Sequence, residues 1–289
     1  MPVPNLRPLE FGEILDGAFS LYRRNLTKFL LTALLPVAVL VVGGAFMALL
    51  VGTGSEAAAG IVSFGLVILL LLSVMVQWGA LVHQASQSFI ARPVGFKEAV
   101  RTGIRSMFTL LGAVVVHNVG MSVVLIGGFL MLGLVAVVGG ALEIPALSMV
   151  LGAGMIFGFV FVYVGGAAVL ACAGPAVIVE GKGPVEALSR SVELLRGAFW
   201  RTVGLVMVTA TIVYLPIIAV AFVSGLSEGV SGTEGGAAEA GGGFVILAVA
   251  IAAAPFIASV FVLAYYDRRV RTEALDVQLM TESLALAGD

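Results

Sequence analysis

Two polar pairs stand out within otherwise apolar stretches of the sequence, His83-Gln84 and His117-Asn118. The helical rise per residue places both pairs about 12–17 Å from the nearer ends of their apolar runs. On neighbouring antiparallel helices they would form one polar cluster. Such a cluster would suit a proton or ion relay, because ionisable groups inside a membrane are costly and often functional. The alternative is a pair of neutral histidines that hydrogen-bond across a helix interface, and the absence of Asp, Glu, Lys and Arg from these runs favours it.

No complete catalytic or metal-binding motif accompanies these pairs. Gly120-Met121-Ser122 is loosely similar to the serine element of intramembrane proteases, but Val123 stands where a glycine is expected after the serine. Two histidines and a single cysteine do not complete a four-ligand metal site. The sequence also holds no HExxH, P-loop or dinucleotide fingerprint. We therefore expect neither enzymatic activity nor a cofactor or metal.

The composition indicates a membrane protein. Of 289 residues, 60% are hydrophobic and only 11% are charged, whereas soluble domains carry roughly 25% charged residues. Six uncharged runs each exceed the ~20 apolar residues that a helix needs to cross a bilayer. We predict an all-α polytopic protein with a single integral membrane domain over residues 1–289. Its predicted spans cover approximately residues 29–52, 61–90, 107–139, 146–178, 202–224 and 243–266.

The distribution of charge predicts the orientation and excludes nucleic acid as a partner. All 15 Lys and Arg residues fall within residues 7–28, 92–105, 182–201 and 268–271, on one side of the predicted spans. Because basic loops stay in the cytoplasm, we expect a multi-pass protein of the cell membrane with both termini cytoplasmic. Residues 1–28 include Glu10, Glu13 and Asp16, which a cleaved signal peptide would not carry in its basic n-region. The net charge of −2 supplies no basic field for nucleic acid.

An internal repeat is indicated by three similar segments that precede the first, third and fifth spans. Aligning Glu13, Glu98 and Glu186 gives steps of 85 and 88 residues. In the third segment an apolar stripe at helical spacing begins at Val185 and continues through Val192. We therefore expect three repeats, each an amphipathic interfacial helix followed by a transmembrane hairpin.

Three stretches resemble the membrane-domain family of glycerophosphoryl diester phosphodiesterases: Leu6–Arg24, Pro175–Ser191 and Tyr265–Glu273. The resemblance extends over nearly the whole chain and implies a six-span membrane domain. In some members this domain precedes a soluble TIM-barrel phosphodiesterase, whose barrel needs about 250 residues. Only 23 residues follow Tyr266, and both histidines lie in predicted spans. We therefore expect the catalytic barrel to be absent and its activity not to carry over.

Basic residues close to the span ends are the candidate functional contacts. They are Arg23, Arg24, Arg196, Arg201, Arg268, Arg269 and Arg271. Each would add about 1 kcal/mol of attraction to anionic headgroups, and interfacial anchoring is the alternative explanation. If the last helix continues, Asp267–Arg271 and Arg269–Glu273 would also pair at i,i+4.

We predict a non-catalytic accessory or scaffold protein that organises lipids or a partner at the cytoplasmic face. The expected partners are membrane lipids, together with a protein partner or a second copy of the chain. The alternative is a small-molecule or ion transporter or channel. It is favoured by the repeat, by the two polar pairs, and by prolines within spans that would break their helices, at positions 36, 175, 216 and 255.

The predicted orientation can be tested with a single cysteine at Ser231, in a chain whose Cys172 is replaced by alanine. A membrane-impermeant maleimide should label Ser231→Cys on intact cells, because this position follows the fifth span on the external side. A Thr102→Cys control should label only after permeabilisation. Labelling of Ser231→Cys that also requires permeabilisation would invert the topology.

Overall fold

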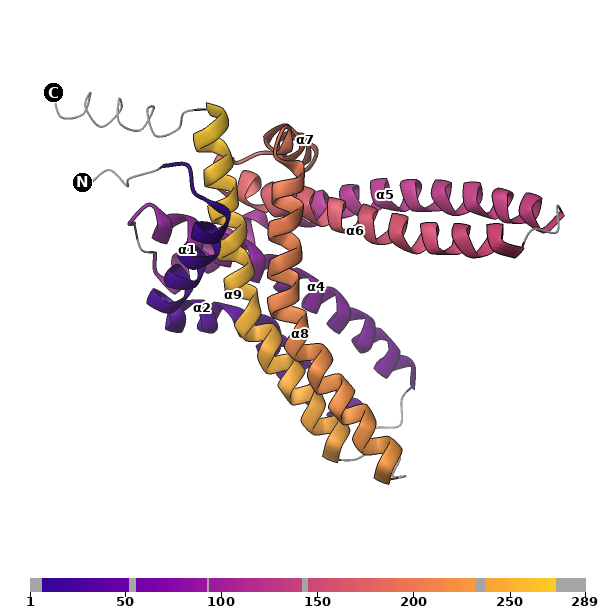
Figure 1. The fold of residues 1–289 in the computed structure, drawn as a ribbon. Helices are drawn as coiled ribbons and strands as arrows, with labels where there is room; N and C mark the ends of the chain where they lie inside the picture. Colours follow the sequence, from indigo (N-terminus) through magenta and orange to yellow (C-terminus); the bar gives the residue numbers. More distant parts are fainter. Residues whose placement is uncertain (1–6, 52–55, 93, 142–144, 232–236, 274–289) are drawn as a thin grey trace.

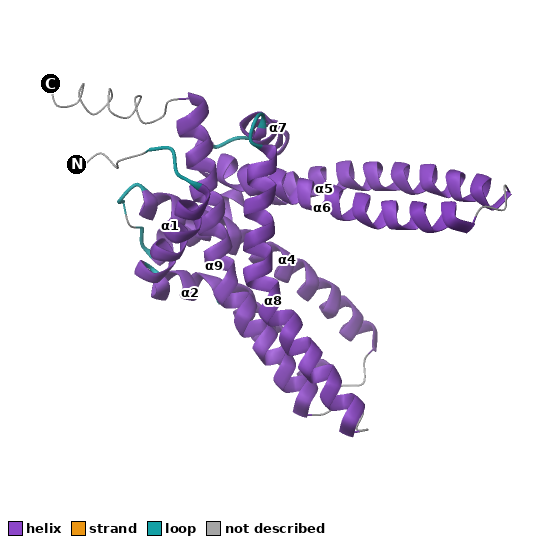
Figure 2. Ribbon diagram, in the orientation of Figure 1, coloured by secondary structure: helices purple, strands orange, loops and turns teal. Residues whose placement is uncertain are grey.

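The computed structural model describes residues 7–51, 56–92, 94–141, 145–231 and 237–273, which are almost entirely helical (Figures 1 and 2). No strand occurs within these ranges. The helices are α1 (Phe11–Arg24), α2 (Leu26–Ala33), α3 (Leu35–Val51), α4 (Glu56–Phe89), α5 (Phe96–Ala141), α6 (Pro145–Glu180), α7 (Pro184–Leu195), α8 (Phe199–Ser231) and α9 (Ala237–Glu273).

The all-helical class and the six membrane-length segments are confirmed. Six stretches are long and apolar enough to cross a membrane: Leu26–Leu50, Ala58–Phe89, Phe96–Val137, Val150–Glu180, Phe199–Val223 and Gly243–Glu273. Most of the helices are longer than the predicted spans. Charged residues at their ends continue the helical backbone hydrogen bonding beyond the apolar run. The loop predicted over residues 224–243 is correspondingly wrong in extent, because α8 continues to Ser231 and α9 begins at Ala237. Its centre, residues 232–236, lies outside the described residues.

The C-terminal half of α9 lies at the centre of the fold. α9 packs against α1, α2, α4, α6, α7 and α8, and Leu263 and Tyr265 on it are almost completely buried. From this centre α5 and α6 leave as one hairpin, while α8 and the first half of α9 leave together in another direction (Figure 1). The outer parts of these hairpins expose large apolar side chains such as Phe129 and Phe157. Apolar surface of this extent is typical of a membrane-facing protein.

Two short helices, α1 and α7, form separate elements before their spans, as predicted. α1 ends at Asn25, whose ψ of 18° leaves the helical range. α7 ends before Gly197, which has φ +78°, a conformation that glycine adopts without steric cost. The middle segment has no such break, and α5 runs continuously from Phe96 to Ala141. The separate interfacial helix predicted there is therefore wrong.

The buried face of α7 also differs from the predicted apolar stripe. Val185 and Val192 are 63% and 46% exposed. The buried positions are Ala187, Ser191, Leu194 and Leu195, and of these only Leu195 lies on the predicted stripe. Small residues at the first two of these positions let the helix approach its neighbours closely, and the Ser191 hydroxyl donates a hydrogen bond to the Val169 carbonyl of α6 at 2.5 Å. Close approach, rather than apolar area, decides which face is inside.

Glycines set the contact between α4 and α5. A Cβ added to Gly103 would lie 2.3 Å from the carbonyl oxygen of Val76, and one added to Gly79 would lie 3.1 Å from the Cα of Gly103. Both clashes are with backbone, which a rotamer change does not relieve. By contrast, nothing lies within 4 Å of a Cβ at Gly158, in the outer part of α6.

Gly103→Ala should therefore destabilise the protein. Forcing α4 and α5 apart lowers the free energy of unfolding by about 1–3 kcal/mol. The better helix propensity of alanine offsets about 1 kcal/mol of this loss. Thermal unfolding in detergent measures the change, with Gly158→Ala as the matched control that should unfold no earlier than the parent. Equal unfolding temperatures for the two variants would contradict the close contact.

Candidate functional site

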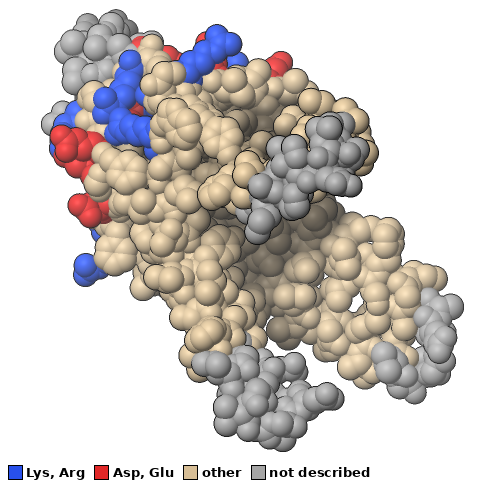
Figure 3. Space-filling view, turned by 45° about the vertical axis from the view of Figure 1, so that its right-hand side comes forward, with Lys and Arg blue, Asp and Glu red and all other residues tan. Residues whose placement is uncertain are grey.

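Charged side chains gather at one end of the molecule, where the short helices and the ends of the spans meet. Figure 3 shows basic and acidic groups together there, while the apolar arms are almost uncharged on this face. The end of α9, Tyr265–Glu273, runs through this polar end and contributes most of its hydrogen bonds. The interactions of this segment determine which cations of the polar end have no ion pair within the described residues.

The Asp267 carboxylate holds the backbone of the segment that leads into α1. With its side chain 2% exposed, Asp267 accepts a hydrogen bond from the Leu9 amide at 2.8 Å and from Arg271 Nε at 2.9 Å. Arg201, at the start of α8, lies 3.3 Å from the other carboxylate oxygen. The guanidiniums of Arg201 and Arg271 both donate in turn to the Leu9 carbonyl. Both backbone polar groups of Leu9, its N–H and its carbonyl, are therefore bound by three charged side chains.

A second cluster joins α6, α7 and α9. Arg190 of α7 donates to both oxygens of Glu180 at 3.2 Å and also to Glu273. Arg269 completes the ring by donating to Glu273 at 2.9 Å, and the Tyr265 hydroxyl donates to Glu180. Burial lowers the pKa of Arg190, but its hydrogen bond to Glu273 and its interactions with Glu180 outweigh burial and leave the pKa raised. The Arg190 guanidinium therefore stays charged throughout the physiological range.

Two further polar side chains of this α9 segment, Arg268 and Tyr266, bind other helices. Arg268, only 9% exposed, donates to the carbonyls of Leu194 and Arg196 at 2.8 and 3.3 Å. A cation at this place stabilises the C-terminus of α7, where the last carbonyls lack helical partners. The hydroxyls of Tyr266 and Ser86 are hydrogen-bonded at 2.9 Å, which ties α9 to α4.

The candidate contact residues therefore divide into two groups. Arg201, Arg268, Arg269 and Arg271 are bound to carboxylates or carbonyls of the same chain, as described above. The i,i+4 pairs Asp267–Arg271 and Arg269–Glu273 are confirmed. The partners that come from distant elements could not be predicted from the sequence, because nothing in the residue spacing links Glu180 to Arg190 or Asp267 to Leu9.

The other group consists of exposed cations. Arg23, Arg24 and Arg196 are exposed, and the guanidinium of Arg23 lies 5.9 Å from the centre of the Phe19 ring. Within the described part of the chain, further exposed cations without an ion pair are Lys28, Arg92, Lys97, Arg101 and Arg105. Lys97, Arg101 and Arg105 were not among the candidate contacts, although they recur every fourth residue.

The two polar pairs are not brought together. α4 and α5 are in register at Gly79 and Gly103. From that level His83 lies four residues toward the polar end, whereas His117 lies fourteen residues away from it. The helical rise separates the pairs by about 27 Å along the hairpin. The predicted shared cluster therefore does not form.

The members of each pair have different surroundings. Thr32 of α2 donates to the Gln84 side-chain oxygen at 3.1 Å, while His83 Nε2 and Gln84 Nε2 are buried without a hydrogen-bond partner among the described residues. His117 lies against α6, with Nε2 3.0 Å from the place that a Cβ on Gly166 would take. Asn118 donates to the Val114 carbonyl of its own helix at 2.8 Å.

The serine considered as a nucleophile also bonds to its own helix. The Ser122 hydroxyl donates to the Asn118 carbonyl at 2.8 Å, and the residue is exposed. Among the described residues no three His, Cys, Asp or Glu side chains are grouped in a way that could hold a metal ion. The geometry offers hydrogen bonding and charge at the polar end rather than a nucleophile with a base.

Comparisons with protein-family models, curated proteins and solved structures found no match to this chain. The resemblance to the phosphodiesterase membrane-domain family therefore stays a prediction from the quoted motifs. The site is described by its geometry alone.

Asp267→Ala should destabilise the polar end. The change leaves the Leu9 amide and two guanidiniums without their acceptor, which costs about 2–3 kcal/mol when the acceptor is buried and the cations are partly exposed. Thermal unfolding measures the loss, and hydrogen exchange at the Leu9 amide should accelerate. Asp16→Ala, which removes an exposed carboxylate from α1, is the matched control, and equal exchange in both variants would count against the clamp.

Proposed function

We propose that this chain is a non-catalytic multi-pass protein of the cell membrane, with both termini in the cytoplasm. It acts as an accessory scaffold that binds anionic lipid headgroups at its cytoplasmic face and so organises lipids or a partner. The observation that carries this proposal is the set of cations that the chain's own carboxylates leave unpaired.

The first part of this set is a stripe on the beginning of α5. Lys97, Arg101 and Arg105 are exposed and recur at i,i+4 on one helical face. Beside them Ile104 and Phe108 are 51% and 66% exposed. A helix that presents cations and apolar side chains together, where it enters the apolar region, suits the boundary between headgroups and acyl chains.

The second part lies on α1 and α2, which precede the first span. Arg23, Arg24 and Lys28 are exposed there, and Phe19 and Leu31 are 53% and 49% exposed. α2 packs against α5, so these cations and the α5 stripe belong to neighbouring elements. Together they supply several groups for anionic headgroups, each contributing about 1 kcal/mol.

The proposal includes three structural repeats. The third residue of α1, α5 and α7 is in each case a glutamate: Glu13, Glu98 and Glu186. Glu13 accepts from the amide of Glu10 at 2.8 Å, and Glu186 accepts from that of Gly183 at 3.3 Å, the arrangement of a helix-capping box. Five residues after each glutamate a small residue is buried: Ala18, Gly103 and Ser191. This correspondence supports a common ancestor for the three segments.

The family assignment belongs to the same proposal. The motifs Leu6–Arg24 and Tyr265–Glu273 support membership of the phosphodiesterase membrane-domain family. The polar contacts made by Asp267 and its neighbours give these motifs a structural role that needs no enzymatic activity.

The transporter alternative has less support. Pro36 lies beside the break at Leu34 that divides the first span into α2 and α3, as predicted. By contrast, α6, α8 and α9 continue without a break through Pro175, Pro216 and Pro255. These three prolines therefore do not produce the half-helices that form midplane sites. The two described cavities lie among the charged residues of the polar end. A scaffold whose charge lies at the surface fits these features better.

The test is a triple variant, Lys97→Gln with Arg101→Gln and Arg105→Gln. Each substitution should weaken the binding of phosphatidylglycerol about fivefold, since these side chains have no internal partner to lose. Mass spectrometry of the lipids that co-purify, and titration in detergent, measure the change. A charge-conserving control, Lys97→Arg with Arg101→Lys and Arg105→Lys, should behave like the parent. Unchanged anionic lipid in the glutamine variant would refute the proposal.

A further inference from the structure

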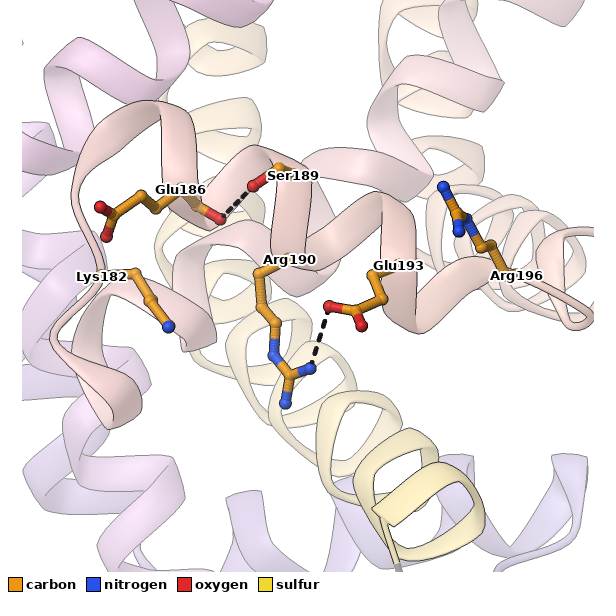
Figure 4. Close-up of a pocket in the computed structure, with 6 residues that line it drawn as sticks. All are labelled: Lys182, Glu186, Ser189, Arg190, Glu193 and Arg196. Atoms are coloured by element: carbon orange, nitrogen blue, oxygen red, sulfur yellow. Dashed lines mark hydrogen bonds and ion pairs between the residues drawn. The ribbon is translucent and has the colours of Figure 1, made fainter.

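A shallow groove of about 370 Å³ runs along the outward face of α7. It is lined by Lys182, Glu186, Ser189, Arg190, Glu193 and Arg196. Figure 4 shows these side chains on one side of α7, with Lys182 near its start and Arg196 just past its end. The groove thus mixes both signs of charge, unlike the cationic stripe of α5.

The internal contacts leave one end of the groove free to bind a ligand. Arg190 is bound to Glu180, Glu273 and Glu193. The Arg196 guanidinium, at this end of the groove, is exposed and has no ion pair within the described ranges. The Glu193 side chain is 64% exposed and accepts only from Arg190 NH1, at 3.2 Å, among the described residues. A carboxylate offers about four acceptor positions, so most of its capacity remains.

We propose that this end of the groove binds the phosphoethanolamine headgroup of a zwitterionic phospholipid. The Arg196 guanidinium matches a phosphate, to which it donates in a planar, bidentate manner. The Glu193 carboxylate accepts from the primary ammonium group of the same headgroup. A ligand that carries both charges uses both side chains, whereas a purely anionic headgroup would meet the repulsion of Glu193.

The surroundings favour a lipid over a soluble headgroup. Val192, adjacent to Glu193, is 46% exposed, and Trp200, at the start of α8, is 70% exposed. Tryptophan is enriched at the membrane interface, where its ring lies at headgroup level. Val192 gives the glycerol and first acyl carbons an apolar surface next to Glu193, and Trp200, which packs against Phe161 and Phe199 outside the groove lining, marks the headgroup level.

The chemistry also distinguishes ethanolamine from choline. A quaternary ammonium has no N–H to donate and is recognised mainly by aromatic faces. The residues that line the groove include no aromatic side chain. We therefore expect phosphatidylethanolamine to bind more tightly than phosphatidylcholine. This inference rests on the proposed membrane orientation, with α7 at the cytoplasmic headgroup level.

Native mass spectrometry of the full chain in detergent tests the site. The protein is titrated with phosphatidylethanolamine, phosphatidylcholine and phosphatidylglycerol of the same acyl chains. Arg196→Gln should weaken ethanolamine-lipid binding about fivefold. Glu193→Gln, which retains the hydrogen bond to Arg190, should bring ethanolamine-lipid binding down to the level of the choline lipid. A parent protein that binds the two lipids equally, or a Glu193→Gln variant with an unchanged preference, would overturn the proposal.

Two further arms separate this result from the function proposed above. Arg101→Gln removes the same charge as Arg196→Gln but should weaken only the phosphatidylglycerol titration and keep the ethanolamine preference. If neither Arg196→Gln nor Glu193→Gln changed the preference for the ethanolamine lipid, this site would be refuted. The proposed lipid binding by the α5 stripe would be unaffected by that result. Soluble phosphoethanolamine should not displace the lipid at a comparable concentration. Displacement would assign the groove to a free headgroup and overturn the lipid assignment.

Discussion

The polar end of this protein depends on the pairing of Asp267 with Arg201 and Arg271 around the Leu9 peptide. A carboxylate with 2% exposure would be strongly unfavourable alone, so its stability requires the two guanidiniums and the amide that surround it. These partners come from α8, α9 and the segment before α1. The same α9 segment binds α6 through Tyr265 and α4 through Tyr266. These polar contacts add to the buried apolar cluster that α1, α4, α6 and α8 share with α9, and fix these helices relative to α9.

This arrangement separates two roles that cations at a membrane boundary can have. Arg268 and Arg269 lose most of their contact with solvent and act inside the protein, whereas Arg101 and Arg196 keep their charge available at the surface. Counting basic residues near span ends does not distinguish these roles, because both kinds occupy the same positions in sequence. Within the described ranges, exposed cations without an ion pair are therefore fewer than the composition implies, and they lie on α1, α2, α5, at Arg92 and at the end of α7.

The helical class and the six membrane-length segments could be predicted from the sequence, because hydropathy over some twenty residues is a strong local signal. The local pairs Asp267–Arg271 and Arg269–Glu273 followed from helical spacing alone. The contact of Arg190 with Glu180 could not be predicted, since it depends on how α6, α7 and α9 pack. The prediction that the two histidine pairs form one cluster was wrong for the same reason. A depth counted from the end of each apolar run ignores the register of α4 and α5, which Gly79 and Gly103 set.

The unbroken course of α5 has a consequence for the surrounding bilayer. The uncharged part of this helix, from Ser106 to Ala141, is about 54 Å long, while the hydrocarbon layer is about 30 Å thick. Immersing that length would need a tilt of roughly 55°, beyond the 0–40° found for membrane helices. Either the membrane thickens around the α5–α6 hairpin or the end of the hairpin projects from it. In the first case the protein would alter membrane thickness locally and partition toward thicker regions of the bilayer.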